Sequence, residues 1–316
     1  MRHLTSFTLL VVAVAGCAQG ASLARAPRLV ARAESEPRDL NTLQAVEGVY
    51  IDPTAGEPYS GSVFSVTEFG TTLSYSLEYG LPHGSYEERY GGGRLKVKST
   101  YTDGDLDGIH EQYYPNGQLA ERTIYEAGKI DGLYEGYSEN GQLLIKGTYE
   151  SGSRNGLYEE YSTNGQLILV NTYQFGQLDG PYQQYYPNGQ LAEQSTYEDG
   201  QIEGLYEGYS ADGQLFIRTM YSEGKRDGVH EEYYDNGQLM SKGNYENGEW
   251  DGVWEFYDST SGQLGSKMIY VDGQRDGLYE TYGPDGQLMS KGNYRAGMRC
   301  GEWLLNSETR TYGIRC

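Results

Sequence analysis

Glutamate recurs at a fixed interval along most of this chain. It stands three residues after a regularly spaced glycine, beginning at Glu87, and Gln183 is the one break in the series. Carboxylates can ligate metal ions, act as general acids and bases, or bind the cations of a partner. The candidate binding ladder comprises Glu111, Glu135, Glu159, Glu207, Glu231, Glu255 and Glu280.

The spacing of this row decides between those chemistries. If each repeat is a β-hairpin, successive carboxylates are about 10 Å apart, because neighbouring strands lie about 4.8 Å from one another. Two carboxylates at that distance cannot share one metal ion or form a glycosidase pair, whose carboxyls lie roughly 5 to 9.5 Å apart. The row predicts either a ladder for regularly spaced cations or a solvated acidic stripe that keeps the sheet soluble.

The remaining reactive residue types are too sparse to form a catalytic site. The chain has four histidines, of which His110 and His230 occupy a position that Tyr or Trp fills in other repeats. The run Gly91-Gly92-Gly93 falls where other repeats have a turn, so it is a loosened hairpin and no phosphate loop. We therefore expect no catalytic residue, no metal site and no cofactor, and we expect that the protein is not an enzyme.

An aromatic residue two places after each repeat glycine forms a second row. Rows of rings on a sheet can cover one another across strands as structural ribs. Exposed rings can also stack on sugars, which leaves glycan binding as an alternative, although the chain has only three tryptophans. The row comprises Tyr86, His110, Tyr134, Tyr158, Tyr182, Tyr206, His230, Trp254, Tyr279 and Trp303.

These rows are positioned by an internal repeat of 24 residues. Such self-similarity is the mark of a repeat architecture and decides the fold before any local pattern does. A shorter unit opens at Gly61, and a one-residue insertion precedes Gly277, which gives ten repeats over residues 61–300. The repeat glycines are Gly84, Gly108, Gly132, Gly156, Gly180, Gly204, Gly228, Gly252, Gly277 and Gly301.

Each repeat contains two turns and therefore one hairpin. Pairs such as Asn116-Gly117 and Asp212-Gly213 are typical of tight turns because both residue types tolerate a positive φ. A second glycine, such as Gly128 or Gly152, closes the other turn, and strands of about six and eight residues lie between. The sequence predicts an all-β fold, an elongated single-layer antiparallel sheet of about ten tandem 24-residue hairpins.

The repeat core YYPNGQLxxxxxYxxGxx[DE]G, at 113–132 and 185–204, resembles the variant class of MORN (membrane occupation and recognition nexus) repeats. The resemblance extends over about 61–301 and includes a bacterial antitoxin-like family of immunity proteins. It implies a MORN-like hairpin array that serves as a scaffold or binding surface, without shared catalytic residues.

The charge of the chain limits its partners. It has 24 basic and 45 acidic residues and a formal net charge of -21. Nucleic-acid binding requires Lys and Arg to neutralise phosphates, so nucleic acid is excluded, and anionic lipid surfaces are disfavoured for the same reason. An unidentified protein partner, possibly basic in charge, fits this composition.

The N-terminus predicts export and lipidation. Residues 1–16 have a basic start and an apolar run, as a signal peptide does, and the stretch Val14-Ala15-Gly16-Cys17 resembles a bacterial lipobox. Acylated Cys17 would be the only membrane attachment, followed by a tether over 17–47 and a lead-in over 48–60. We expect a lipid-anchored protein of the cell envelope, in the outer membrane of a Gram-negative bacterium, on its periplasmic or surface face.

The last two cysteines predict a covalent cap. Cys300 replaces the polar residue that closes most repeats, and Cys316 ends the chain. Residues 301–316 form a truncated hairpin with its midpoint near Glu308, which places the two cysteines opposite each other. A disulfide between them suits an oxidising envelope and caps the terminal repeat, which has one neighbour only.

Together these features predict a non-enzymatic envelope lipoprotein that acts as a repeat scaffold for protein–protein binding. Two alternatives stay open from the sequence. One is an immunity protein that neutralises a secreted toxin, as the resemblance implies. The other is a glycan-binding or cell-wall-binding module.

Overall fold

The computed structural model describes residues 36–313 together with Arg315 and Cys316. It divides into two compact units, one ending at Gly108 and the other running from Ile109 to Cys316, and each is described by itself. The predicted signal peptide, Cys17 and the predicted tether as far as residue 35 lie outside the described residues. Within the described part, no helix combines the length and the apolar character needed to cross a membrane.

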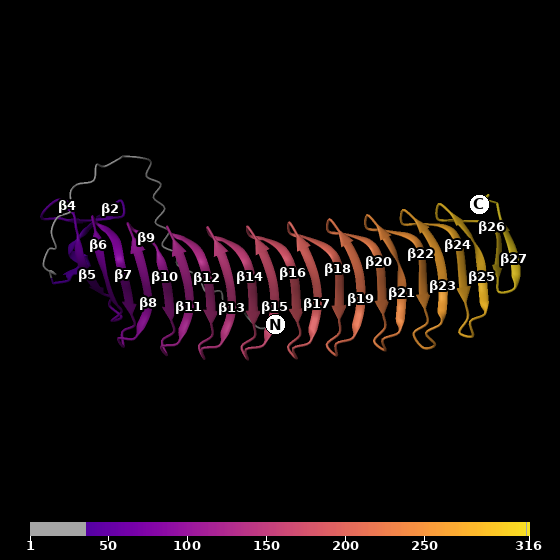
Figure 1. The fold of residues 1–316 in the computed structure, drawn as a ribbon, viewed down its shortest axis with the longest axis horizontal. Helices are drawn as coiled ribbons and strands as arrows, with labels where there is room; N and C mark the ends of the chain where they lie inside the picture. The colour runs from indigo at the N-terminus through magenta and orange to yellow at the C-terminus, as the bar shows by residue number, and fades with distance from the viewer. Residues whose placement is uncertain (1–35, 314) are drawn as a thin grey trace. The chain divides into compact units, whose positions relative to one another are not determined.

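The second unit is one antiparallel sheet in which each strand is hydrogen-bonded to the next strand in sequence (Figure 1). From β11 to β25 the strands alternate between eight and nine residues. The strands are β10 (Gly108–Tyr113), β11 (Leu119–Glu126), β12 (Lys129–Tyr137), β13 (Leu143–Glu150), β14 (Ser153–Tyr161), β15 (Leu167–Gln174), β16 (Gln177–Tyr185), β17 (Leu191–Glu198), β18 (Gln201–Tyr209), β19 (Leu215–Ser222), β20 (Lys225–Tyr233), β21 (Leu239–Glu246), β22 (Glu249–Tyr257), β23 (Leu264–Val271), β24 (Gln274–Tyr282), β25 (Leu288–Arg295), β26 (Met298–Leu305) and β27 (Glu308–Tyr312).

The hairpin prediction is confirmed, and the first strand of each repeat is longer than the sequence predicts. We expect about six residues, whereas β12 has nine, because the strand begins three residues before the repeat glycine Gly132 and continues through it. Gly132 has a φ of 120°, which a side chain would make unfavourable. The repeat glycine is therefore a bend inside a strand and not a turn.

The Asn-Gly turn of a repeat uses different chemistry from that predicted, whereas the other turn is closed by glycine as predicted. In the turn before β11, only Gly117 has a positive φ. The side chain of Asn116 instead accepts a hydrogen bond from the backbone N–H of Gln118 at 2.9 Å and donates to the carbonyl of Glu139 in the next repeat. Two consecutive residues with positive φ, the mark of type I′ hairpins, occur at the other turn, as at Ala127 and Gly128.

Successive repeats are also joined through the carboxylate that precedes the repeat glycine. Oδ2 of Asp131 accepts a hydrogen bond from the backbone N–H of Ser151, in the type I′ turn one repeat later, at 3.0 Å. The same link joins Asp227 to Asn247 at 3.2 Å. These bonds satisfy turn N–H groups that would otherwise rely on water, and they tie each hairpin to the next.

The first unit contains a less regular arrangement. A short β1 pairs in parallel with β5, which continues through β6, β7 and β8 to β9 in antiparallel order, and β2, β3 and β4 form a separate three-stranded sheet. Its elements are β1 (Arg38–Asp39), the 3-10 helix η1 (Leu40–Thr42), β2 (Gln44–Val46), β3 (Val49–Asp52), β4 (Glu57–Pro58), β5 (Gly61–Val66), β6 (Thr72–Glu78), β7 (Leu81–Arg89), β8 (Leu95–Thr102) and β9 (Asp105–Leu106).

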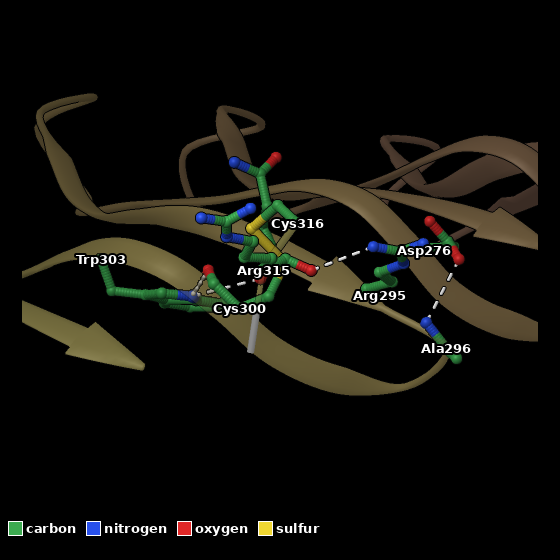
Figure 2. Close-up of a disulfide and its surroundings, with 8 residues drawn as sticks. Asp276, Arg295, Ala296, Cys300, Trp303, Arg315 and Cys316 are labelled. Atoms are coloured by element: carbon green, nitrogen blue, oxygen red, sulfur yellow. Dashed lines mark hydrogen bonds between the residues drawn. A yellow bond between two sulfur atoms is a disulfide. The ribbon is translucent and has the colours of Figure 1, made fainter. Parts of the chain in front are cut away.

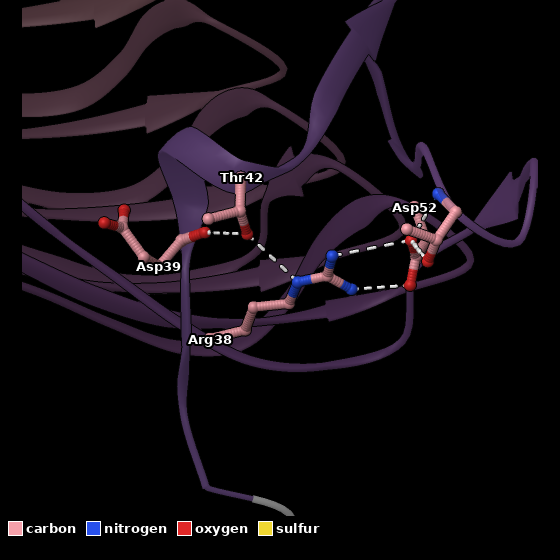
Figure 3. Close-up of polar contacts among 5 residues, drawn as sticks. Arg38, Asp39, Thr42 and Asp52 are labelled. Carbon is pink, nitrogen blue, oxygen red and sulfur yellow. Dashed lines mark hydrogen bonds and ion pairs between the residues drawn. The ribbon is translucent and has the colours of Figure 1, made fainter.

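An ion pair fixes the start of this unit (Figure 3). Nη1 of Arg38 lies 2.5 Å from Oδ2 of Asp52, and Nε of Arg38 donates to the hydroxyl of Thr42 at 3.0 Å. The hydrogen bond from Arg38 lowers the pKa of Asp52 well below its usual range. Residues 38–46 thus form elements of the unit, where the sequence predicts a tether.

The fold class predicted from the sequence is confirmed: the chain is all-β and built from tandem antiparallel hairpins. Its buried residues form small local clusters along the sheet. One groups Tyr245, Trp254, Met268 and Tyr270, and another, in the first unit, groups Val63, Tyr75 and Leu77. A single sheet layer has only side chains of its own face to bury against, so its stability comes from neighbouring strands.

Candidate functional site

One face of the second unit carries the predicted glutamate row, with basic residues between its members. Arg218 stands directly opposite Glu207 on one side and Glu231 on the other. Its Nη2 lies 2.8 Å from Oε1 of Glu207, and its Nη1 lies 3.7 Å from Oε2 of Glu231. We call this the ladder face, and we call the following row the charge ladder: Glu111, Arg122, Glu135, Lys146, Glu159, Glu207, Arg218, Glu231, Lys242, Glu255, Lys267, Glu280 and Lys291.

The ion pairs extend along most of the ladder. Arg122 lies 3.0 Å from Glu111 and 3.5 Å from Glu135, and Lys291 lies 2.9 Å from Glu280. Glu255 contacts two ammonium groups, Lys242 at 2.9 Å and Lys267 at 3.2 Å. The row is therefore neither a solvated acidic stripe nor a set of carboxylates awaiting a partner's cations, because basic side chains of the same sheet neutralise it.

Tyrosines on the same strands also bind the ladder carboxylates. In five repeats the tyrosine two residues after the glutamate donates its hydroxyl to that carboxylate at 2.6–2.9 Å. Burial acts to raise the pKa of Glu255, but hydrogen bonds from Lys242, Tyr257 and Lys267 outweigh it and lower that pKa to about 2. Burial also acts to raise the pKa of Glu207, but hydrogen bonds from Tyr209, Gln194 and Arg218 outweigh it and lower that pKa.

The sequence contains a signal for these partners that the row of glutamates alone does not reveal. In most repeats Lys or Arg follows the glutamate by eleven residues, as in Glu111 and Arg122 or Glu207 and Arg218. A separation of eleven places both residues at the same height on paired strands of one hairpin. Because the strand register places these basic residues opposite the glutamates, the acidic row becomes a row of ion pairs.

The charge ladder is interrupted at one place. Val170, Gln183 and Gln194 occupy three successive ladder positions on β15, β16 and β17 and stand opposite one another. The hydroxyl of Tyr185 still donates to Oε1 of Gln183 at 2.9 Å, and Nε2 of Gln194 donates to Glu207 at 2.7 Å. The hydrogen-bond pattern is thus retained while the charges are absent.

An apolar row runs beside the charge ladder on the same face. It consists of the apolar residues that directly follow most of the repeat glycines. Each stands two positions before the ladder residue on the same strand, as Leu205 stands before Glu207, and Leu205 pairs with Met220 on the next strand. Five of these side chains are between 42% and 53% exposed, an uncommon state for large aliphatic residues repeated in register. The exposed members of this apolar row are Ile109, Leu157, Leu205, Val229 and Val253.

The opposite face, which we call the aromatic face, carries the predicted row of rings. Most of these rings pack against a tyrosine of the following strand, as Tyr134 does against Tyr149 with centroids 5.9 Å apart. His230 takes the same place, 5.3 Å from the ring of Tyr245, and is 2% exposed. The rings therefore act as structural ribs, and the histidine substitutes for one of them.

Several rings also cover a glycine on the preceding strand. A Cβ atom built on Gly147 would lie 2.7 Å from Cδ2 of Tyr158, and one on Gly243 would lie 2.3 Å from Cδ2 of Trp254. Trp254 is 1% exposed, and Trp303, which covers Gly292, is fully buried. Two of the three tryptophans therefore cannot stack on a sugar.

The C-terminal repeat ends in a covalent cap (Figure 2). Cys300 and Cys316 form a disulfide across a sequence separation of 16, and Cys300 is completely buried. Nε1 of Trp303 donates to the carbonyl of Cys300 at 3.2 Å, and Arg295 donates to the carbonyl of Arg315 at 3.1 Å. The hairpin turns at Asn306 and Ser307, slightly before the predicted midpoint at Glu308.

The first unit has an open depression of about 730 Å³. Its lining includes serines, the aromatic side chains of Phe64 and Tyr75, and the carboxylates of Glu36 and Glu87. Among the residues described here, no group of three or more His, Cys, Asp or Glu side chains could hold a metal ion. The features that repeat over many strands lie on the ladder face of the second unit.

Comparison with known proteins agrees with the repeat structure. Six segments match the family model described as MORN repeat variant. The matched residues are 106–127, 130–151, 154–174, 178–199, 226–247 and 275–296. No curated protein matches the chain.

Among solved structures, the chain is similar to part of the crystal structure of TcdB2-TccC3-Cdc42. The two are 15% identical, with a TM-score of 0.18. The match covers 74% of this chain and spans 16% of that chain.

Proposed function

Because the chain carries repeats of the MORN variant type, we propose that it is a non-enzymatic repeat scaffold of the cell envelope that binds a protein partner along its ladder face. The observation that carries this proposal is the apolar row. Aliphatic side chains that are about half exposed in register along a sheet mark an interaction surface more often than single exposed residues do.

The charge ladder supports the same use of this face. A surface of free carboxylates would lose its hydration when covered, at a high cost in free energy. Here Glu207, Glu255 and Glu280 already pair with basic residues and tyrosine hydroxyls, so they are partly desolvated before any partner binds. The surface beside them includes the half-exposed aliphatic side chains of the apolar row, and apolar side chains are enriched at the core of protein interfaces.

The aromatic face is less suited to a partner. Its rings pack against one another, and several cover glycines of the sheet itself. Arginines such as Arg154, whose guanidinium lies 4.1 Å from the ring centre of Tyr158, cover others. These contacts stabilise the sheet, and a partner would have to displace them.

The binding experiment compares the full-length chain with a variant that carries Val229→Asp and Val253→Asp. Both chains are immobilised and exposed to envelope extract, and retained proteins are identified by mass spectrometry. We expect a specific protein partner to be retained by the wild type and reduced about tenfold or more by the variant, since two buried carboxylates would face an apolar contact.

The matched control carries Thr163→Asp and Ala211→Asp, which add the same charge at exposed turn positions away from the apolar row. It is expected to retain the partner as the wild type does. Equal retention by all three chains would contradict binding through the apolar row. Retention of polysaccharide instead of protein would favour the glycan alternative.

We also propose that Cys17 anchors the protein to a membrane through its acyl chains. The support is the sequence around it, since Cys17 lies outside the described residues. A Cys17→Ala variant is expected to move from the membrane fraction to the soluble fraction of the envelope, because two or more acyl chains are needed for stable attachment. A variant that stays with the membrane would contradict the anchor.

A further inference from the structure

Tyrosine and arginine alternate across the last strands of the aromatic face. Arg275 stands opposite Tyr270, Arg299 stands opposite Tyr294, and Tyr312 follows on the final strand, β27. The guanidinium of Arg275 lies 5.5 Å from the ring centre of Tyr294, so both arginines adjoin this ring. We call these five residues the arginine row: Tyr270, Arg275, Tyr294, Arg299 and Tyr312.

The two arginines of this row have no carboxylate partner among the residues that the structure describes. Nε of Arg275 donates to the hydroxyl of Tyr270 at 3.4 Å, and Nη1 of Arg299 donates to the hydroxyl of Tyr312 at 3.0 Å. Arg299 also lies over Trp303, with 4.5 Å between the guanidinium and the ring centre. Both arginines are exposed, and each guanidinium has five N–H groups, so donors remain for a ligand.

Two earlier repeats with an arginine at this position also carry a glutamate on the same face. The glutamate stands four residues after the repeat glycine, as Glu160 does in the repeat of Arg154 and Glu232 in the repeat of Arg226. Arg154 lies over the ring of Tyr158, whose hydroxyl donates to Glu160 at 3.0 Å. A carboxylate of the same repeat and the same face therefore offsets the charge of each of these arginines.

The last two repeats lack this carboxylate. Thr281 and Leu305 occupy the position that Glu160 and Glu232 hold in the earlier repeats. The final strand does carry Glu308, opposite Leu305, but this glutamate pairs with Arg310 at 3.8 Å. A chain with a net charge of -21 thus has two guanidinium groups without a compensating charge at one place on its surface, which favours an anionic ligand there.

The spacing and the chemistry of the row indicate which anion fits. Arg275 and Arg299 are two strands apart, which corresponds to about 10 Å. In a polyproline II helix, residues three apart lie on the same side and about 9 Å from each other. Carboxylates at every third residue therefore match the two arginines, whose planar guanidinium groups suit carboxylates. Such helices also dock on surfaces lined by aromatic side chains, which the tyrosines provide here.

We propose that the arginine row binds an acidic polypeptide segment in the polyproline II conformation, which lies across the strands. Its carboxylates contact Arg275 and Arg299, and its backbone packs on Tyr294 between them. Because the segment binds N–H groups that the tyrosines do not use, no ring of the aromatic face has to move. This site lies on the face opposite the apolar row, and it does not depend on the partner proposed for the ladder face.

The test measures the binding of a fluorescent peptide of repeated Glu-Pro-Pro triplets by fluorescence anisotropy. The protein is the full-length chain with Cys17→Ala, which removes the predicted acyl anchor. We expect saturable binding that weakens as the salt concentration rises, because ions screen exposed charges. A peptide of the same composition with its glutamates consecutive is expected to bind about threefold more weakly or less, because its carboxylates no longer match the spacing of the arginines.

Arg275→Gln with Arg299→Gln is expected to weaken binding about tenfold or more, because both charge-assisted contacts are lost. The matched control carries Arg154→Gln and Arg226→Gln, which remove the same charge from the same face where glutamates offset it. This control is expected to bind the peptide as the parent does. If the first variant loses its β-sheet circular dichroism, Arg275→Lys with Arg299→Lys replaces it and is expected to bind about threefold more weakly, since lysine lacks the planar fork.

The variant with Val229→Asp and Val253→Asp is expected to bind the peptide normally, so that failure of this site and failure of the ladder face are told apart. Equal peptide binding by the parent and by a folded variant of both arginines would overturn the inference. A parent chain that binds no peptide at about 1 mM would overturn it as well. Binding of polygalacturonate, or of vesicles containing phosphatidylglycerol, without binding of the peptide would overturn it in favour of a polysaccharide or a lipid surface.

Discussion

Glu255 illustrates how a carboxylate becomes part of a single-layer sheet. It is mostly buried, yet its two oxygens contact Lys242 and Lys267 and accept the hydroxyl of Tyr257. With these partners the ionised form is favoured, and its pKa falls to about 2. The folded chain therefore resists protonation of Glu255, whereas the unfolded chain takes up a proton near pH 4.5.

This difference predicts a stability change in acid. Stability from Glu255 is fully present above about pH 4.5 and is lost as the pH falls toward about 2. A Glu255→Gln variant is expected to lose roughly 1 kcal/mol at neutral pH and to lack that part of the acid dependence. Thermal unfolding followed by circular dichroism measures both.

Glu139→Gln, at an exposed turn residue outside the ladder, serves as the control and should behave as the wild type does. If Glu255→Gln and Glu139→Gln lowered the melting temperature equally, the ladder would not contribute through this carboxylate.

His230 is a titratable ring that is buried among aromatic side chains, and its charged form is disfavoured there. It packs between Tyr245 and Trp254, its Nδ1 has no hydrogen-bond partner, and its Nε2 lies 3.4 Å from Glu232. Burial lowers the pKa of His230 below its usual value of 6.5, although Glu232 opposes this and Arg226 adds to it. The folded chain therefore binds the proton less readily than the unfolded chain.

Because the pKa of His230 is lower in the folded chain, the free energy of unfolding is fully retained above about pH 6.5. It decreases as the pH drops from about 6.5 to the lowered pKa. The slope is at most about 1.4 kcal/mol per pH unit. His230→Tyr is expected to reduce the loss between about pH 7.5 and 5.5, because tyrosine fills the slot in other repeats and does not titrate there. Melting temperatures across that range measure it, and parallel pH curves for the two chains would contradict it.

At the scale of the element, the fit of a ring over a glycine defines the register of neighbouring hairpins. The indole of Trp254 lies over Gly243, and its Nε1 donates to the carbonyl of Asn244 at 3.0 Å, which fixes the ring in place. Gly243 has no positive φ, so its role is to leave room for the ring. Any side chain there must move the indole or separate the strands.

Gly243→Ala is accordingly expected to destabilise the region of β21 and β22 by about 1–3 kcal/mol through overpacking. Hydrogen exchange measured by mass spectrometry would show faster exchange in these two strands. Gly136→Ala is the matched control, because a Cβ there would meet only ordinary contacts, the nearest at 3.6 Å. Equal effects of the two substitutions would mean that the ring does not depend on the glycine.

The disulfide is an element-scale constraint on the last hairpin. The Cys300–Cys316 bond joins the buried start of β26 to residues beyond β27, the final strand of the unit. Replacing both cysteines with serine is expected to cost about 3 kcal/mol by the chain-entropy estimate for a loop of this size. Hydrogen exchange should rise in β26 and β27 and remain unchanged from β11 to β20. Unchanged protection of β26 and β27 would contradict a capping role.

Much of the element scale could be predicted from the sequence. Glycines and turn residues recur every 24 positions, and each position has one backbone role, so hairpins follow from the period alone. The turn chemistry was only partly predictable, because Asn116 uses its side chain where a positive φ is expected. The elements at residues 38–58 were missed because they depend on single contacts, such as Arg38 with Asp52, that no repeat signals.

The candidate site was less accessible to sequence reasoning. The sequence identifies the glutamates, but whether their charges are neutralised depends on which residues stand opposite them on the neighbouring strands. Strand register determines those neighbours. Val170 and Gln194 mean little until they are found on either side of Gln183. The interruption of the charge ladder can be recognised only once the pairing of its residues across the strands is known.

At the scale of the whole molecule, a repeat array offers a long surface with the same chemistry in every repeat. Because contacts are between neighbouring strands, stability is a sum of local terms, and exposed positions can vary without loss of the fold. The apolar row and the charge ladder extend along most of the second unit and are interrupted at β15 to β17. An extended surface of this kind suits the scaffold that we propose.

We propose that a protein partner binds the ladder face. Hydroxyl-radical footprinting of the full-length chain, alone and with the partner retained from envelope extract, tests it most directly. We predict reduced labelling of apolar-row residues, Val229 and Val253 among them, with no change at aromatic-face residues such as Tyr134 and Tyr149. Protection confined to the aromatic face, or labelling unchanged on both faces, would contradict the claim.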